Sequence, residues 1–149
     1  MNTELYELLE QYEKTKNKTL ETKIKTAFSP FRSGSAALVQ INSVIGDFKY
    51  NAKKILEYIN LAQNTEVELV IFPEYALCGY PISDLAEKHP QIVSENEKYL
   101  KAISKKVKNT AVLVGFIKQE NGKLFSALAL LQNGEIKDIV KKPDRKSTR

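Results

Sequence analysis

Hydrophobic residues between positions 36 and 72 form two short runs with one periodic segment between them. Residues 36–42 and 68–72 are apolar runs bounded by polar and turn-forming residues, a pattern typical of buried strands. In residues 49–65 the apolar positions recur at steps of three and four, so they line one face of a helix. The order strand, helix, strand predicts two parallel strands joined by a right-handed crossover.

The following segment predicts one more helix and then three strands. Residues 92–107 carry apolar side chains at helical spacing, and residues 111–117 form a third apolar run. The dipeptides Asn121-Gly122 and Asn133-Gly134 readily take the positive φ angles of tight hairpin turns, and they flank a further apolar run. We therefore expect a three-stranded antiparallel meander that ends near residue 140.

The amino-terminal residues follow a different pattern. Leucine and tyrosine residues between positions 5 and 12 lie at helical spacing in a Lys-rich stretch, which predicts one amphipathic helix. Residues 29–35 contain a proline, a glycine and serines, which break a helix and favour a linker. The chain thus divides into a helical, Lys-rich extension with its linker (1–33), an α/β domain (34–142) and a basic tail (143–149).

Composition narrows the class of protein. The 149 residues are 42% hydrophobic and 28% charged, as in a globular protein with one core. No apolar run approaches the roughly 20 residues needed to cross a bilayer, and the first residues lack the order of a secretory signal. Cys78 is the only cysteine, which excludes an internal disulfide and a cysteine-cluster metal site. We expect a cytoplasmic protein without a membrane partner.

The net charge of +5 is concentrated near the carboxyl end. Residues 137–149 contain six basic and two acidic residues, with no aromatic residue among them. Such a run is more typical of a solvated chain end than of a surface that binds nucleic acid. We therefore expect no nucleic-acid partner.

Glu74 is the clearest candidate for chemistry. It follows an apolar run and Pro73, and ligands of α/β sheets gather at the carboxyl ends of the strands. Burial beside Phe72, Tyr75 and Tyr80 would raise the pKa of its carboxyl group and suit it to proton transfer near neutral pH. A loop carboxylate in water is the competing interpretation.

Other residues with potential chemistry also have ordinary interpretations. Lys142 ends the last predicted strand and could stabilise an oxyanion, although it and Lys141 would look the same in a solvated tail. Cys78 could act as a nucleophile, but between a leucine and a glycine it is better interpreted as a packing thiol. No partner ligands flank His89, so we interpret it as a surface residue and not as a metal ligand.

Several short motifs occur along residues 36–142: residues 37–42, Gly46-Asp47-Phe48 with Asn51, Phe72-Pro73-Glu74, Gly79-Tyr80-Pro81 and Asp84-Leu85. This set resembles the glutaminase domain at the amino end of bacterial glutamine-dependent NAD synthetases, a branch of the nitrilase superfamily. The Gly-Asp pair and the combination of Gly-Tyr-Pro with Asp-Leu are typical of the synthetase branch, whereas the Phe-Pro-Glu turn is shared by the whole superfamily.

The resemblance implies a partial αββα sandwich in which a Glu, a Lys and a Cys hydrolyse glutamine through a thioester. Glu74 matches the general base, and Lys142, or alternatively Lys141, matches the lysine that stabilises the oxyanion. The resemblance implies glutamine as a small-molecule substrate and no cofactor for the glutaminase part. It is compatible with a homo-oligomer. ATP and Mg belong to the synthetase domain of the family, of which no part is found in this sequence.

The sequence also departs from the family pattern. The family cysteine lies well beyond the lysine and would fall past Arg149, whereas Cys78 stands in the Gly-Tyr-Pro loop. Residues 143–149 lack the Leu-Pro-containing loop that follows the lysine in the family. In the family, the first strand normally begins near the amino terminus, whereas here residues 1–33 precede it. Ser126 stands where asparagine is common in the family. We predict a truncated glutaminase domain, inactive alone. The alternatives are a non-catalytic binding or assembly module and a fragment of another nitrilase-type amidase.

Overall fold

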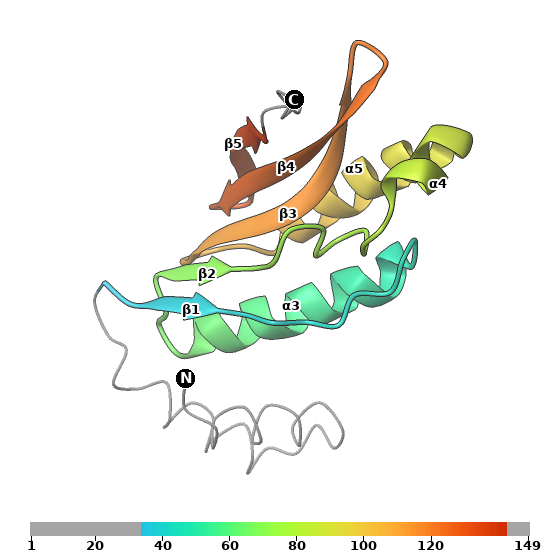
Figure 1. The fold of residues 1–149 in the computed structure, drawn as a ribbon. Helices are drawn as coiled ribbons and strands as arrows, with labels where there is room; N and C mark the ends of the chain where they lie inside the picture. The colour runs from blue at the N-terminus through green and yellow to red at the C-terminus, as the bar shows by residue number, and fades with distance from the viewer. Residues whose placement is uncertain (1–33, 143–149) are drawn as a thin grey trace, which may run out of the picture.

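The computed structural model describes residues 34–142, so the predictions for residues 1–33 and 143–149 lie outside the described residues. The described residues form an α/β fold in which a single sheet carries helices on one side (Figure 1). The elements follow in the order β1 (Ala36–Leu38), α3 (Phe48–Asn64), β2 (Leu69–Ile71), α4 (Ser83–Lys88), α5 (Gln91–Ser104), β3 (Ala111–Glu120), β4 (Lys123–Gln132) and β5 (Glu135–Lys141).

The sheet has five strands in the order β1-β2-β3-β4-β5. β1, β2 and β3 are parallel, and β3, β4 and β5 form an antiparallel meander, which confirms the predicted parallel pair and the predicted hairpins. Both hairpins turn at an Asn-Gly pair with positive φ angles, 50° and 75° at Asn121 and Gly122 and 51° and 80° at Asn133 and Gly134. The turn chemistry therefore fixes where the meander reverses.

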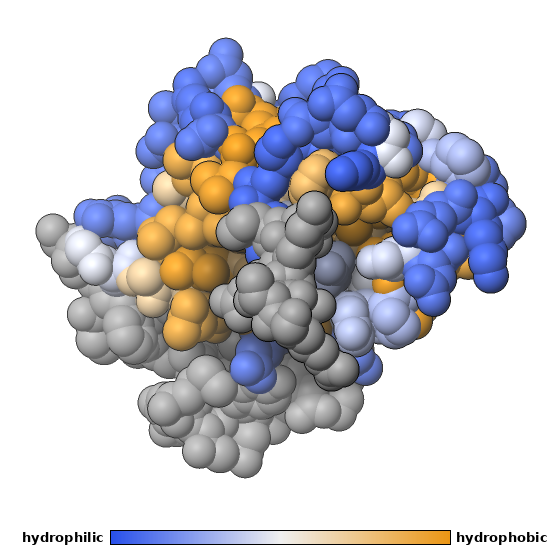
Figure 2. Space-filling model, turned by 45° about the horizontal axis from the view of Figure 1, so that its top comes forward, coloured by the Kyte–Doolittle hydropathy of each residue, from blue (hydrophilic) through white to orange (hydrophobic). Residues whose placement is uncertain are grey.

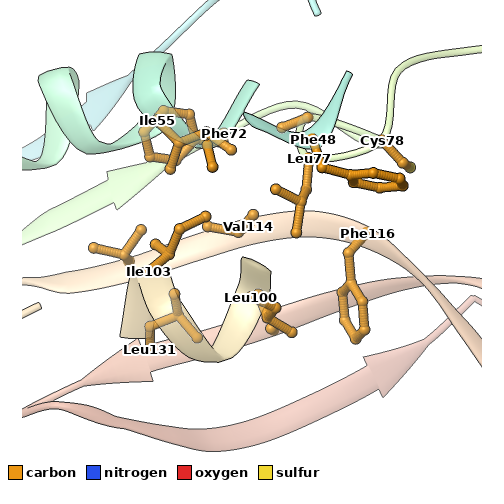
Figure 3. Packing of buried hydrophobic residues seen from close by; sticks show 14 of the residues in the cluster. Phe48, Ile55, Phe72, Leu77, Cys78, Leu100, Ile103, Val114, Phe116 and Leu131 are labelled. Carbon is orange, nitrogen blue, oxygen red and sulfur yellow. The ribbon is translucent and has the colours of Figure 1, made fainter. Parts of the chain in front are cut away.

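α3 and α5 cover the same face of the sheet, as connections of one hand between parallel strands require (Figure 1). Figure 3 shows Leu100 and Ile103 of α5 close to Val114 and Leu131 of the sheet, and all four side chains are buried. Each fully buried side chain of this size contributes about 1.5–3 kcal/mol to folding. The core is therefore the layer between the helices and this face.

The opposite face of the sheet is only partly covered. Strand side chains alternate between the two faces, so Leu113, Leu128 and Leu130 point away from the helices, and each is intermediate in exposure. Leu38 and Val140 on the same face are 71% and 62% exposed. Figure 2 shows hydrophobic residues gathered on the surface between hydrophilic ones. We call the sheet face that lies opposite the helices the open face.

Among the described residues, no helix is long and apolar enough to cross a membrane.

Some element boundaries differ from the sequence predictions. The strand predicted for residues 36–42 ends at Leu38; Val39 still donates to the Ile71 carbonyl, and the chain then leaves the sheet towards α3. α5 ends at Ser104 and not at residue 107. α4 was not predicted, because its six residues are too few to reveal a helical period.

Candidate active site

The turn that carries Glu74 continues along β3 after β2 has ended. The Phe72 amide donates to the Leu113 carbonyl at 2.9 Å, and the Leu77 amide donates to the Gly115 carbonyl at 3.1 Å. A Cβ atom at Gly115 would lie 2.3 Å from the Pro73 carbonyl oxygen and 2.8 Å from the Glu74 Cα atom. The missing side chain of Gly115 therefore lets the turn lie directly on the strand.

A buried asparagine of α3 holds the same turn from the other side. Asn51 is fully buried; its Nδ2 donates to the Leu77 carbonyl at 3.0 Å and to the Val44 carbonyl at 2.8 Å, while its Oδ1 accepts from the Val44 amide at 2.8 Å. The Ser43 hydroxyl donates to the Ala76 carbonyl at 2.7 Å. These bonds explain why a polar residue occupies the buried side of the helix: it ties the loop before α3 to the Glu74 turn.

The backbone of the turn is strained at Tyr75, whose φ of 60° is uncommon for a residue other than glycine. Such a conformation costs about 1–3 kcal/mol and persists where the surroundings determine it. The bonds to Gly115 and Asn51 provide such surroundings. The position of Glu74 is therefore fixed by the fold and is not a free loop conformation.

Glu74 meets two side chains from the distant meander. The Ser126 hydroxyl of β4 donates to Glu74 Oε1 at 2.7 Å, and Lys142 Nζ lies 3.2 Å from Oε1 and 3.3 Å from Oε2. Ser126 and Lys142 are cross-strand neighbours, since the Lys142 amide donates to the Ser126 carbonyl at 2.8 Å. The structure thus brings together the two residues that the sequence singled out, Glu74 and Lys142, and adds Ser126.

Lys141, the alternative lysine, points to the other face of the sheet. Its ammonium pairs with Glu120 and lies 5.1 Å from the centre of the Phe125 ring. Successive side chains of a strand alternate between faces, so only one of the two lysines can face Glu74. Of the two, the structure directs Lys142 to the carboxylate.

The electrostatic environment of Glu74 differs from the sequence prediction. The hydrogen bond from Ser126 lowers the pKa of the Glu74 carboxyl group, partial burial opposes this, and the hydrogen bond and charge of Lys142 lower the pKa further. The predicted rise of the pKa was wrong because the Glu74 side chain is 46% exposed. Tyr80, itself 73% exposed, packs on the Tyr75 ring at 5.6 Å between ring centres. Glu74 is therefore a carboxylate at neutral pH.

Cys78 is a buried packing thiol, as the sequence interpretation expected. Its side chain lies in the hydrophobic core near Phe48 and Leu77 (Figure 3), and burial raises the pKa of the thiol to about 12. A thiol with this pKa supplies almost no thiolate at neutral pH. Cys78 is therefore not suited to nucleophilic attack, and His89 lies exposed at the end of α4, as predicted.

An open hollow of about 690 Å³ lies beside the Glu74 contacts. Ser126 and Lys142 line it together with Glu87 and the β3–β4 hairpin residue Lys123. A space of this size can hold a small molecule. The carboxylate contacts thus border a hollow whose wall carries side chains of both charges.

A carboxylate and an ammonium meet beyond the carboxyl end of a parallel strand, and this fold is that of a carbon-nitrogen hydrolase. The chain belongs to this family, whose profile matches residues 35–147. It is homologous to the glutaminase part of glutamine-dependent NAD synthetases, which confirms the resemblance inferred from the sequence. The synthetase of Thermotoga maritima is 36% identical over 107 residues, covering 70% of this chain and 18% of that protein.

Two solved structures confirm the predicted α/β fold class. The glutamine-dependent NAD(+) synthetase from Cytophaga hutchinsonii matches with a TM-score of 0.68 and 25% identity over 72% of this chain and 18% of that chain. An amidase from Nesterenkonia has a TM-score of 0.61 at 18% identity, over 72% of this chain and 41% of that chain, and shares the fold. The chain therefore spans about a fifth of the length of the synthetases that it matches.

Proposed function

We propose that the chain is part of a glutamine amidohydrolase domain in which Glu74 is the general base and Lys142 stabilises the oxyanion. The observation that carries this proposal is the contact of Lys142 Nζ with both carboxylate oxygens of Glu74, at 3.2 and 3.3 Å, across 68 residues of sequence. The family membership supports glutamine as the amide, and so do the relatives, which are glutamine-dependent NAD(+) synthetases.

The chemistry assigned to the two residues follows from their charges. A carboxylate can take the proton of a thiol nucleophile and return it to the departing ammonia, and then take a proton from the water that hydrolyses the thioester. An ammonium beside the reacting carbonyl stabilises the negative charge that develops on the carbonyl oxygen. The net reaction converts glutamine and water into glutamate and ammonia.

We further propose that the 149-residue polypeptide has no turnover by itself. Cys78 is its only cysteine, and this thiol is buried with a pKa raised to about 12. The first test measures ammonia release from glutamine by the purified chain, with E74Q and C78A as companion variants. Release that depends on Glu74 would refute the proposed inactivity, and loss of such release in C78A would show that our assignment of the thiol is wrong.

A chimera tests the assigned roles directly. Residues 36–142 would replace the matching segment of the Thermotoga maritima synthetase, which would then supply the rest of the protein. We expect glutamine hydrolysis by the chimera and a loss of about a hundredfold or more in kcat for E74Q and for K142M. A folded chimera that does not hydrolyse glutamine, or an E74Q variant with unchanged kcat, would contradict the proposal. Faster hydrolysis of simple aliphatic amides would favour another nitrilase-type amidase.

A non-catalytic assembly module is the second candidate, and the open face is the observation that favours it. Leu38 and Val140 are among its most exposed side chains, and large exposed apolar areas tend to find a partner. Size measurement in solution tests this candidate. A monomer with one cooperative thermal transition would count against it, and a defined oligomer would support it.

A further inference from the structure

Ser126 makes the shortest of the polar contacts that reach the Glu74 carboxylate. Its hydroxyl lies 2.7 Å from Oε1, compared with 3.2 and 3.3 Å for the contacts of Lys142. Ser126 lies on β4 opposite Ile117 of β3 and next to Lys142, the residue that directly follows β5. It therefore stands on a strand between the turn that carries the carboxylate and the lysine that pairs with it.

The two carboxylate oxygens have unequal partners. Oε1 accepts from Ser126 and from Lys142, whereas among the described residues Oε2 receives only the longer contact from Lys142. A strong hydrogen bond to one carboxylate oxygen makes that oxygen less basic and fixes the orientation of the group. The oxygen left for an incoming proton is therefore Oε2.

Packing alone gives little reason for a serine at this position. The neighbours of Ser126 on the same face of β4 are Leu124 and Leu128, and the facing residue on β3 is Ile117. Ser126 is half-buried at the border of the hollow, and the side chain that its hydroxyl contacts is Glu74.

We propose that Ser126 is a positioning residue that holds Glu74 through Oε1 and leaves Oε2 as the oxygen that accepts the proton. This inference rests on the proposed function, in which Glu74 is the general base. It assigns Ser126 no contact with the substrate, so its effect on the reaction passes through the carboxylate.

Threonine and valine at position 126 form a matched pair of variants. They have nearly the same shape, and S126T keeps the hydroxyl that S126V removes, so a difference between them reports the hydrogen bond and not the packing. The first measurement follows the Glu74 side-chain carboxyl carbon by NMR as the pH is lowered, in the full 149-residue chain, and thermal unfolding checks that each variant is folded. S126A is measured as well, in case the larger side chains prevent folding.

We expect S126V and S126A to raise the midpoint of the Glu74 titration towards its ordinary value of 4.5 and S126T to keep the wild-type midpoint. Equal midpoints in S126T and S126V, or a wild-type midpoint in S126A, would overturn the assignment. This measurement requires no turnover, so it does not depend on the outcome of the proposed function.

The second measurement is the pH profile of kcat/KM in the chimera. We expect S126V to lose about tenfold or more in kcat/KM and to move the acidic limb to higher pH, while S126T keeps the wild-type profile. A chimera without hydrolysis would refute the proposed function. The NMR titrations would still show whether the hydrogen bond from Ser126 acts on the Glu74 carboxylate. An active chimera with identical S126T and S126V profiles would refute the positioning role.

Discussion

Replacing Gly115 by alanine should disturb the candidate site from beneath it. The added Cβ atom would lie 2.3 Å from the Pro73 carbonyl oxygen, and ordinary contact begins at 3.4 Å, so the turn must withdraw by roughly 1 Å. The neighbouring atoms are backbone atoms, which cannot rotate away as the end of a flexible side chain can. Overpacking of this kind costs about 1–3 kcal/mol, and we expect a value in the upper half of this range.

The same withdrawal would break the contact between the carboxylate and β4. The Ser126 to Glu74 bond is 2.7 Å long, and lengthening it by roughly 1 Å takes it beyond hydrogen-bonding range. Because this bond is the largest cause of the lowered pKa of Glu74, the pKa should rise in G115A. Urea unfolding measures the stability, with an expected fall of the midpoint by roughly 1–2 M, and the NMR titration of Glu74 measures the pKa.

Gly122 provides the matched control. An alanine Cβ atom there would meet nothing within 4 Å, but the φ of 75° would strain it. G122A should therefore lose about 1 kcal/mol and leave the titration of Glu74 unchanged. The reasoning fails if G115A folds with wild-type stability and an unchanged Glu74 titration, or if G122A shifts that titration as much as G115A does.

Three further predictions concern the supports and charges of the site. Asn51→Leu leaves backbone groups of Val44 and Leu77 without their hydrogen-bond partner. It should lower the free energy of unfolding, measured by urea titration, by about 2–3 kcal/mol. Unchanged stability would contradict the anchoring role of Asn51. Cys78 should react with a thiol reagent at least about a hundredfold more slowly in the native chain than in urea, and equal rates would show an accessible thiol. The folded-state pKa of Glu74 lies below its ordinary value of 4.5, so the carboxylate stabilises the fold above that pH and loses this contribution as the pH falls through the folded value. The stability advantage of wild type over E74Q should accordingly shrink as the pH falls through 4.5 and below it, and an advantage that grows would contradict the sign.

Local patterns predicted the parts of the fold that local chemistry determines. The periodic apolar face of residues 49–65 corresponds to α3 at Phe48–Asn64, and the side chain of Asp47 caps its first turn by accepting from the Tyr50 amide. The two Asn-Gly pairs marked the hairpins because few other residues take positive φ angles readily. Glu74 could be identified because it follows an apolar run and a single proline.

The environment of Glu74 could not be predicted in the same way. Its aromatic neighbours in sequence suggested burial, but exposure depends on where the turn lies relative to the sheet. Ser126, which dominates its pKa, is 52 residues away in sequence. A signal for Ser126 was present nevertheless, since it is the polar residue that interrupts the apolar run of β4. Its partner could not be identified without the position of the turn on Gly115.

The choice between Lys141 and Lys142 depends on a bulge that the sequence did not reveal. From the Asn133-Gly134 turn, Gln132 pairs with Glu135 and Leu131 with Ile136, and uninterrupted pairing would place Lys141 opposite Ser126. The register instead shifts between Leu130 and Leu131, so that Leu130 pairs with Asp138 and residue 137 has no partner in the ladder. This one extra residue turns Lys141 to the helix-covered face and places Lys142 beside Ser126. The Glu74–Lys142 contact therefore depends on a single irregularity of β5, which explains why alternation alone left both lysines open.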